Sequence, residues 1–363
     1  MTMDITTLLT FAVQSGASDV HLSSGEPPLI RIHGDMKRLD HPSLSRDEVH
    51  ALVYDIMDDG QRKAFEEHLE LDFSFDMGET GRFRVNVFLQ QRGEGAVFRT
   101  IPTKILSIEQ LGLPAILKKL CDREKGLILV TGPTGSGKST TLAAMVDYLN
   151  DTFPGHIITI EDPIEFTHHS KKCLVNQREL GPHTHSFANA LRAVLREDPD
   201  IILVGEMRDL ETIQLAITAA ETGHLVFGTL HSPGAPQTVD RVIDVFPAGQ
   251  QAQIRTQFAD SIEAIVTQTL CKKKAGGRVA ALEILVGTTA VRNLIREGKV
   301  HQIPSAMQVG QKDGMQTMDM SLVDLANRGV ITREEAQMKS MTPNLFGQTA
   351  VGVNGKAAMG RLA

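Results

Sequence analysis

The spacing of apolar and polar positions differs between the first part of the chain and the remainder. Residues 4–16 place apolar side chains at helical spacing, and residues 82–88 alternate arginine or asparagine with phenylalanine or valine. The second pattern is the period of a strand with one wet face. Ser45 and Glu48 have capping-box spacing, so a helix is expected to start there. Residues 1–100 therefore predict a small α+β domain. Two further short strands are expected in it, at 19–22 and 29–33.

A second pattern follows a breaker-rich stretch at 101–115, which we interpret as an interdomain linker. Beyond it, four short apolar runs rich in isoleucine, leucine and valine alternate with helical segments. Continuous apolar strands that alternate with helices predict a parallel sheet covered on both faces, within a domain over residues 116–287. The apolar runs lie at 127–131, 157–160, 201–204 and 225–229, and the helical segments at 138–150, 186–197 and 209–222.

The C-terminal part of the chain lacks strand-like runs. Residues 288–340 have a helical pattern throughout. Residues 341–363 consist largely of glycine, alanine, asparagine and threonine, without periodicity. We therefore expect a helical C-terminal extension that is followed by a disordered tail.

The composition is that of an ordinary globular protein, and it excludes several classes. Of 363 residues, 41% are hydrophobic and 22% are charged, which argues against wholesale disorder and fibrous repeats. The net charge is -7, so a general nucleic-acid binder held by electrostatics is not expected. Cys121, Cys173 and Cys271 form no CxxC pair, so neither a disulfide framework nor a thiolate zinc site is supported.

No segment is expected to cross a membrane. The start of the chain lacks the basic region of a signal peptide, and no apolar run approaches the ~18 residues that span a bilayer. We therefore expect a cytoplasmic protein whose membrane association is peripheral only. The basic run at 272–274 precedes two glycines and favours a solvated hairpin turn over a contact with anionic lipid.

A phosphate-binding loop follows the first apolar run. Residues 132–139 match the pattern GxxxxGK[ST], with a predicted strand before it and a predicted helix after it. In such a loop, main-chain N–H groups surround the β-phosphate, the lysine reaches the β and γ oxygens, and the serine hydroxyl binds Mg²⁺. A nucleoside triphosphate and Mg²⁺ are therefore expected here. The residues expected to contact them are Gly132, Pro133, Thr134, Gly135, Ser136, Gly137, Lys138, Ser139 and Thr140.

Acidic residues stand just past the carboxyl ends of two predicted strands, where ligands bind in open α/β sheets. Glu206 follows one strand, and Glu161 and Glu165 follow another. Beside a phosphate loop, we expect Glu206 to hold Mg²⁺ through a water, and Glu165 or Glu161 to orient and deprotonate the attacking water. The alternative is that these are helix caps or solvated acids, as is expected of Asp209.

Two histidines, His224 and His231, bracket the fourth apolar run. A histidine beside an apolar strand is more often a structural residue. Next to the predicted carboxylates, however, an imidazole could sense the γ-phosphate and couple its loss to movement. Both histidines therefore stay catalytic candidates, whereas the remaining histidines lack ligand spacing and are expected on the surface.

These motifs resemble those of the type II/IV secretion ATPases in order and spacing. Within that superfamily the chain is most similar to the retraction ATPases of type IV pili, the PilT family, from residue 16 to residue 320. The matching segments are 132–140 for the Walker A motif, 160–166 for the Asp box, 201–209 for the atypical Walker B motif, 224–231 for the His box, and 290–297 (AVRNLIRE) for that family's AIRNLIRE signature.

The resemblance implies a PAS-like N-terminal domain and a RecA-like P-loop ATPase domain in a homohexameric ring. ATP would lie between the two domains and a neighbouring subunit, with Glu165 as general base and Glu206 as the Walker B acid. The ring would act at the cytoplasmic face of the inner membrane, on the platform protein of the pilus machine, and drive twitching motility. Pilus extension ATPases usually carry a four-cysteine zinc site, which this sequence lacks, so the resemblance favours retraction.

Two further groups gain a role from the ring. Arg82, Arg84 and Arg99 are the first group: they could simply line the wet face of the N-terminal sheet, or one or more could reach a neighbour's γ-phosphate. Arg292 and Arg296 are a solvated stripe on spacing alone. The resemblance makes them, with Leu294, a coupling element.

Several functions are consistent with these motifs. The first is a motor in which ATP hydrolysis changes the angle between two domains. The second is an accessory or regulatory paralogue that binds ATP but contributes little force, and an extension or secretion ATPase is a weaker third. A RecA-type DNA helicase is disfavoured by the acidic composition and by the presence of only two tyrosines and no tryptophan for base stacking.

Overall fold

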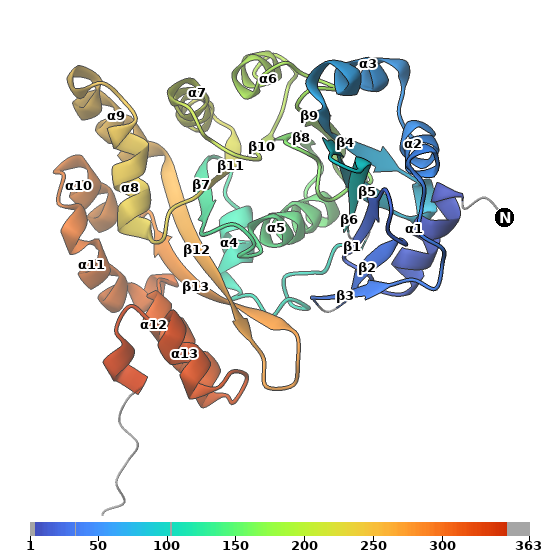
Figure 1. The fold of residues 1–363 in the computed structure, drawn as a ribbon. Helices are drawn as coiled ribbons and strands as arrows, with labels where there is room; N and C mark the ends of the chain where they lie inside the picture. Colours follow the sequence, from blue (N-terminus) through green and yellow to red (C-terminus); the bar gives the residue numbers. More distant parts are fainter. Residues whose placement is uncertain (1–3, 33, 102–103, 347–363) are drawn as a thin grey trace, which may run out of the picture.

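The computed structural model describes residues 4–32, 34–101 and 104–346, and it contains two separate sheets. A six-stranded antiparallel sheet belongs to the N-terminal domain, drawn in blue at the right of Figure 1. A seven-stranded, mostly parallel sheet forms the larger domain, and helices of the C-terminal extension follow it. The predicted combination of an α+β domain, a parallel α/β domain and a helical extension is confirmed.

The N-terminal sheet is buried on one face only. Three helices cover this face, where Phe83, Val85 and Phe98 are fully buried. The predicted alternation therefore appears as a strand with one apolar and one polar face, and the capping box of Ser45 and Glu48 is present. The sheet has the order β3-β2-β1-β6-β5-β4. The elements are α1 (Ile5–Gln14), β1 (Asp19–Ser23), β2 (Leu29–Ile32), β3 (Asp35–Arg38), α2 (Arg46–Tyr54), α3 (Asp59–His68), β4 (Glu70–Asp76), the 3-10 turn η1 (Gly78–Thr80), β5 (Arg82–Gln90) and β6 (Gly93–Ile101).

The larger sheet has the order β13-β12-β7-β11-β10-β8-β9, and all its neighbouring strands are parallel except β12 and β13. Every residue of β7, β10 and β11 is buried, as expected for a sheet covered on both faces. Its elements are α4 (Ile116–Cys121), β7 (Gly126–Thr131), α5 (Lys138–Thr152), β8 (His156–Glu161), β9 (Leu174–Glu179), α6 (Phe187–Val194), β10 (Ile201–Val204), α7 (Leu210–Glu221), β11 (Leu225–Leu230), α8 (Ala235–Asp244), α9 (Ala248–Ser261), β12 (Ile262–Lys272) and β13 (Arg278–Val286).

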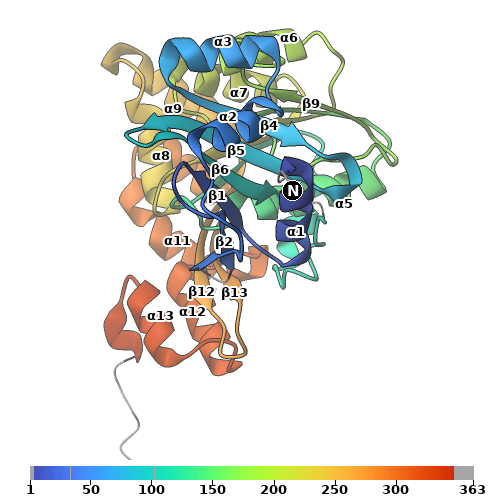
Figure 2. The ribbon, with the colours of Figure 1, turned by 45° about the vertical axis from the view of Figure 1, so that its right-hand side comes forward.

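The C-terminal extension packs beside the hairpin of β12 and β13, as both views show (Figures 1 and 2). The basic run at 272–274 lies at this hairpin's turn, where Gly276 and Gly277 take positive φ angles of 86° and 73°. The extension consists of α10 (Thr289–Arg296), η2 (Val300–Gln302), α11 (Ile303–Val309), η3 (Gly310–Asp313), α12 (Met318–Asn327), α13 (Arg333–Lys339) and η4 (Pro343–Phe346).

Two expectations about irregular segments need correction. The stretch at 101–115 is not a simple linker, because Ile101 ends β6 and Ile108 and Leu113 are buried in the core of the larger domain. Residues 341–346, which were expected in the disordered tail, belong to the described part of the chain and include the 3-10 turn η4. The side chain of Asp319 accepts hydrogen bonds from Ser340 Oγ (2.6 Å) and Met341 N (3.0 Å), and this contact fixes the start of the segment that forms η4. Residues 347–363 of that expected tail lie outside the described residues.

Candidate nucleotide-binding site

The phosphate loop connects β7 to α5 at the carboxyl edge of the larger sheet. Gly137 is the N-cap of α5, and no side chain caps this end of the helix. The first N–H groups of α5 therefore stay available, and a helix N-terminus with free N–H groups favours an anion. This is the local geometry that the motif predicts.

Gln268 of β12 supports this loop from the neighbouring strand. Its Nε2 donates to Ser136 O (2.7 Å), and its Oε1 accepts from Thr141 Oγ1 (2.7 Å). A Cβ on Gly132, which has a φ of 135°, would lie 2.3 Å from Gln268 O, and a Cβ on Gly137 would lie 2.7 Å from Gln268 Nε2. Glycine is therefore required at position 132 for steric reasons, and at position 137 it is favoured by the positive φ of 89°.

The loop's own polar atoms fit a phosphate ligand. Ser136 Oγ is buried and has no hydrogen-bond partner within the described ranges. Lys138 Nζ donates to the carbonyl oxygens of Gly132 (3.0 Å) and Pro133 (3.1 Å), so the ammonium lies over the loop. Burial lowers the pKa of Lys138, while the charges of Glu206 and Glu165 act in the opposite direction. An anion in the loop would satisfy the hydroxyl and offset the cost of the buried cation.

Glu206 stands at the same edge, just past β10, in an ion-pair network. Arg208 Nη2 lies 2.7 Å from Glu206 Oε2, and His231 Nε2 lies 3.3 Å from Glu206 Oε1. The hydrogen bond from Arg208 holds the pKa of Glu206 below its usual value, so this carboxylate is ionised at neutral pH. Glu206 and Arg208, together with Asp162, line an open cavity of about 330 Å³. Glu206 therefore borders open space, and its role in holding Mg²⁺ through a water stays a prediction.

Glu161 and Glu165 differ in their surroundings. Glu161 accepts hydrogen bonds from Thr159 Oγ1 (2.6 Å) and Gln177 Nε2 (3.0 Å), and burial raises its pKa. Glu165 is exposed, and its charge acts on Lys138. Of the two, Glu165 is therefore the carboxylate that is free to reach a water near the phosphate loop.

The two candidate histidines lie at opposite ends of β11, His224 at the amino end and His231 at the carboxyl end. His231 follows the last residue of β11, which pairs with Thr131 beside the phosphate loop. His224 precedes β11, and its main-chain carbonyl accepts from the N–H of Gly126 at the amino end of β7. Its Nδ1 contacts the carbonyl of Ala219 (2.9 Å) at the end of α7. The expectation that His224 joins the catalytic group of its own chain is therefore wrong, because a residue before a parallel strand lies at the amino edge.

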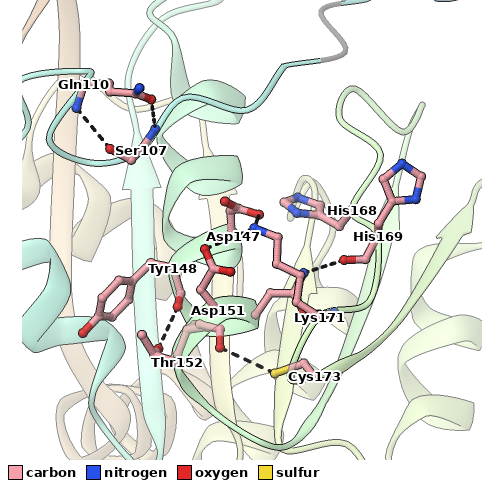
Figure 3. A network of polar contacts seen from close by, with 12 residues as sticks. Ser107, Gln110, Asp147, Tyr148, Asp151, Thr152, His168, His169, Lys171 and Cys173 are labelled. Atoms are coloured by element: carbon pink, nitrogen blue, oxygen red, sulfur yellow. Dashed lines mark hydrogen bonds and ion pairs between the residues drawn. The ribbon is translucent and has the colours of Figure 1, made fainter. Parts of the chain in front are cut away.

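The loop that carries Glu165 is tied to the end of α5. The buried Asn150 donates to the carbonyl of His169 (2.7 Å) and accepts from the N–H of Lys171 (2.9 Å). The Lys171 ammonium binds Asp147 (2.7 Å) and Asp151 (3.1 Å), as Figure 3 shows. The start of α5 belongs to the phosphate loop, and its end is bonded to the segment that follows Glu165. Helix α5 therefore connects the phosphate loop to the Glu165 loop.

The polar face of the N-terminal sheet is turned away from its covering helices and carries the three arginines. Arg84 and Arg99 are register partners across β5 and β6, and like charges opposite one another are destabilising. Asp19 lies 2.9 Å from Arg99, and Asp72 lies 3.9 Å from Arg84. Arg84 and Arg99 keep 45% and 67% of their side chains exposed, so both can meet an anionic partner. Arg82 differs, since it forms an ion pair with Glu179 of the larger domain.

A comparison with protein families gives a match over nearly the whole chain. The model of the type II/IV secretion system protein family matches residues 1–342. The chain belongs to that family. The matched range contains the phosphate loop, the strand-end carboxylates and both histidines.

Comparison with individual relatives shows which members of the family this chain resembles. The chain is 62% identical over 344 residues to the type IV pilus retraction ATPase PilT of Pseudomonas aeruginosa, covering 95% of this chain and 100% of that protein. It is 42% identical over 335 residues to the type IV pilus ATPase PilU of the same organism, covering 92% and 88%. A crystal structure of the pilus retraction motor PilT with bound ADP superposes with a TM-score of 0.89 at 50% identity, covering 94% of this chain and 98% of that chain. The predicted resemblance to the PilT group is confirmed.

Within 4–32, 34–101 and 104–346, no helix is long and apolar enough to cross a membrane. Over the same ranges no group of three or more histidine, cysteine or acidic side chains could hold a metal ion by itself. The three cysteines are buried and unpaired with one another.

The residues of the AVRNLIRE motif are built into the larger domain. Arg292 donates to the carbonyls of Gly287 (2.7 Å) and Ala259 (2.9 Å) and pairs with Glu263 (2.5 Å), and Arg296 pairs with Asp260. A solvated stripe is therefore the wrong interpretation for Arg292, because its guanidinium caps main-chain carbonyls at the end of α9. Leu294 is half-buried against the core.

Sequence reasoning missed several residues that organise this family's site, above all Gln268, Glu179 and Gln177. Each belongs to a strand, and its side chain forms hydrogen bonds with a loop or with a segment that is distant in sequence. Gln177, for example, donates to Glu161 and to the carbonyl of Phe166. For Gln268, a polar residue within a mostly buried strand is a usable signal, since buried amides need partners. No such signal marks Gln177 or Glu179, because β9 (LVNQRE) is largely polar. Arg208 lies inside the Walker B segment and could have been found from its spacing to Glu206.

Proposed function

We propose that this chain is a motor ATPase that hydrolyses ATP to power the retraction of type IV pili. The observation that carries the proposal is the 62% identity to a pilus retraction ATPase over 95% of the chain. The carboxyl edge of the larger sheet supports it, because a phosphate loop, an ionised carboxylate and an exposed carboxylate meet there. The chain is an ATP hydrolase of the RecA-like class.

The proposed chemistry assigns one task to each group. The loop residues and Lys138 bind the β- and γ-phosphates, and Glu165 accepts a proton from the attacking water. Ser139 and Glu206 would hold Mg²⁺, which when bound neutralises charge on the phosphate oxygens. His231, beside Glu206, would sense whether the γ-phosphate is present. His224 has no part in this group within one chain.

The proposed assembly is a homohexamer on the platform protein at the cytoplasmic face of the inner membrane. The neighbouring Arg84 and Arg99 support a contact between subunits, because two exposed guanidinium groups on one sheet face suit a phosphate of the adjacent subunit. Arg292, Leu294 and Arg296 would couple the ring to the platform protein through α10. The proposed partners do not include a nucleic acid.

An accessory role like that of a second pilus ATPase is the alternative. The identity to PilU is 42%, against 62% to PilT, and this difference favours the retraction motor. A deletion strain separates the two roles. Loss of the motor should give cells that have excess pili and do not twitch, whereas loss of an accessory ATPase should leave twitching largely intact.

The decisive experiment complements that deletion with variants of this chain. Wild type and Lys312→Ala, an exposed control in η3, should restore twitching and normal pilus number, whereas Lys138→Ala should not. Purified Lys138→Ala protein should lose ATP hydrolysis by at least ~10²-fold, because the ammonium stabilises charge on the transferred phosphoryl group. Undiminished hydrolysis by this variant, or a deletion strain without pili, would contradict the proposal.

A further inference from the structure

One carboxylate joins the two domains of this chain. Glu179 is the last residue of β9 in the larger domain, and β9 lies beside β4 of the N-terminal sheet in both views (Figures 1 and 2). Glu179 accepts hydrogen bonds from Ser74 Oγ (2.9 Å) and Arg82 Nη2 (2.6 Å), both from the N-terminal domain. Only 4% of the Glu179 side chain and 15% of the Arg82 side chain are exposed. The contact is therefore a buried ion pair, in which either partner alone would be an uncompensated charge.

The same carboxylate holds the loop that carries Glu165. The N–H of Ile164 donates to Glu179 Oε2 (3.1 Å), and the Ile164 side chain is buried. Glu165 is the next residue along the chain. Glu179 is also the register partner of Glu161 across β8 and β9. Glu179 Oε2 is therefore shared between Arg82 of one domain and the Glu165 loop of the other.

The ion pair lies near the point where the chain leaves the N-terminal sheet and continues toward the larger domain. Arg82 is the register partner of Ile101, the last residue of β6. Its Nε is buried and finds no acceptor among the described residues. A guanidinium with an unused buried donor is incompletely satisfied. This arrangement is therefore one that a change of domain angle can relieve.

We infer that Glu179 is a positioning residue that transmits the orientation of the N-terminal domain to Glu165. When the N-terminal domain turns away, Ser74 and Arg82 leave the carboxylate together. Water then solvates Glu179, and the N–H of Ile164 loses an acceptor that is fixed from two sides. Glu165 is free to shift in that orientation and is held in the orientation seen here. The inference rests on the proposed role of Glu165 as general base.

The test reads the link at the main chain, in the assembled full-length protein. Ser74→Ala removes one donor in the N-terminal domain without touching the Glu165 loop or the phosphate loop. Asp72→Asn is the matched control, since Asp72 lies on the same strand and is 59% exposed, and its ion pair within the described part of the chain is with Arg84 at 3.9 Å. Hydrogen exchange of the amides at 164–166, measured without nucleotide, should rise several-fold in Ser74→Ala and stay unchanged in Asp72→Asn.

Turnover then shows whether the link reaches the chemistry. Ser74→Ala and Glu179→Gln should lower kcat about tenfold or more, since small misplacements of a catalytic group cost up to ~10²-fold. Nucleotide affinity should stay within about twofold, because neither residue touches the phosphate loop. Wild-type exchange at 164–166 in both variants would overturn the inference. Raised exchange with unchanged kcat would also overturn it, by excluding transmission to Glu165. Because exchange is read without nucleotide and turnover is read on the purified protein without pili, neither result depends on the retraction assignment.

Discussion

The two sheets of this molecule present their functional side chains in different ways. The larger sheet is buried on both faces, so its chemistry is confined to the carboxyl edge, where the phosphate loop, Glu206 and Glu165 lie. The N-terminal sheet is buried on one face, so its arginines stand on the other, open face. An edge concentrates groups for catalysis within one chain, whereas an open face can meet a second chain. The following predictions test this division of roles.

The largest expected effect is at the open face. Arg84→Ala or Arg99→Ala should lower the ATP turnover of the assembled ring by about 10³- to 10⁵-fold, the contribution of an arginine supplied by a neighbour. Nucleotide affinity of the monomer should persist, because neither arginine is part of the phosphate loop. Turnover measured against protein concentration would show the effect.

Arg31→Ala is the matched control for these two variants. Arg31 lies in the same sheet and pairs weakly with Asp19, at 3.8 Å. Turnover equal to wild type in both Arg84→Ala and Arg99→Ala would contradict the assignment of the open face to a neighbour's nucleotide.

The next effect is at the edge. Glu165→Gln should lower kcat by about 10² to 10⁴, the usual contribution of a general base, while ATP still binds. Single-turnover hydrolysis and nucleotide binding measured on the same sample would separate the two quantities. Glu124→Gln, an exposed acid of the same domain, should behave as wild type. If Glu161→Gln instead caused the larger loss, the buried carboxylate would be the base and Glu165 would not.

Sequence predicts the edge better than it predicts the contacts behind it. Strand ends follow from apolar runs, so Glu206 could be placed beside the phosphate loop without a structure. His224 was misplaced because the runs locate both ends of a strand, while only the carboxyl end meets ligands in a parallel sheet. Gln268 contacts Ser136 across 132 residues, and Glu179 contacts Arg82 across 97. Such pairings depend on the order of strands, which no local pattern contains.

A smaller effect should follow from the support behind the phosphate loop. Gln268→Leu removes the hydrogen bonds to Ser136 and Thr141 and leaves buried groups unpaired, at a cost of roughly 1–3 kcal/mol. We expect ATP affinity to fall about tenfold with a smaller change in kcat, because the loop is loosened while the base stays in place. Isothermal titration with an ATP analogue would measure this. Gln253→Leu, on the exposed face of α9, is the control, and equal affinities in both variants would exclude a supporting role for Gln268.

The smallest effect concerns pH and is confined to the larger domain. Burial lowers the pKa of His168 to about 4, with Asp147 opposing this shift and Lys171 and His169 reinforcing it. The folded protein thus holds His168 neutral, whereas the unfolded chain takes up a proton near pH 6.5. Stability from this group is complete above pH 6.5 and is lost as the pH falls toward 4, by on the order of 1–3 kcal/mol.

His168→Gln should flatten the fall in unfolding temperature between pH 7 and about pH 4.5. The control is His169→Gln at the neighbouring exposed histidine, labelled in Figure 3. This variant should keep the wild-type dependence of unfolding temperature on pH. Equal slopes in all three proteins would mean that acid acts elsewhere, and the carboxylates on the open N-terminal face would then be the groups to examine.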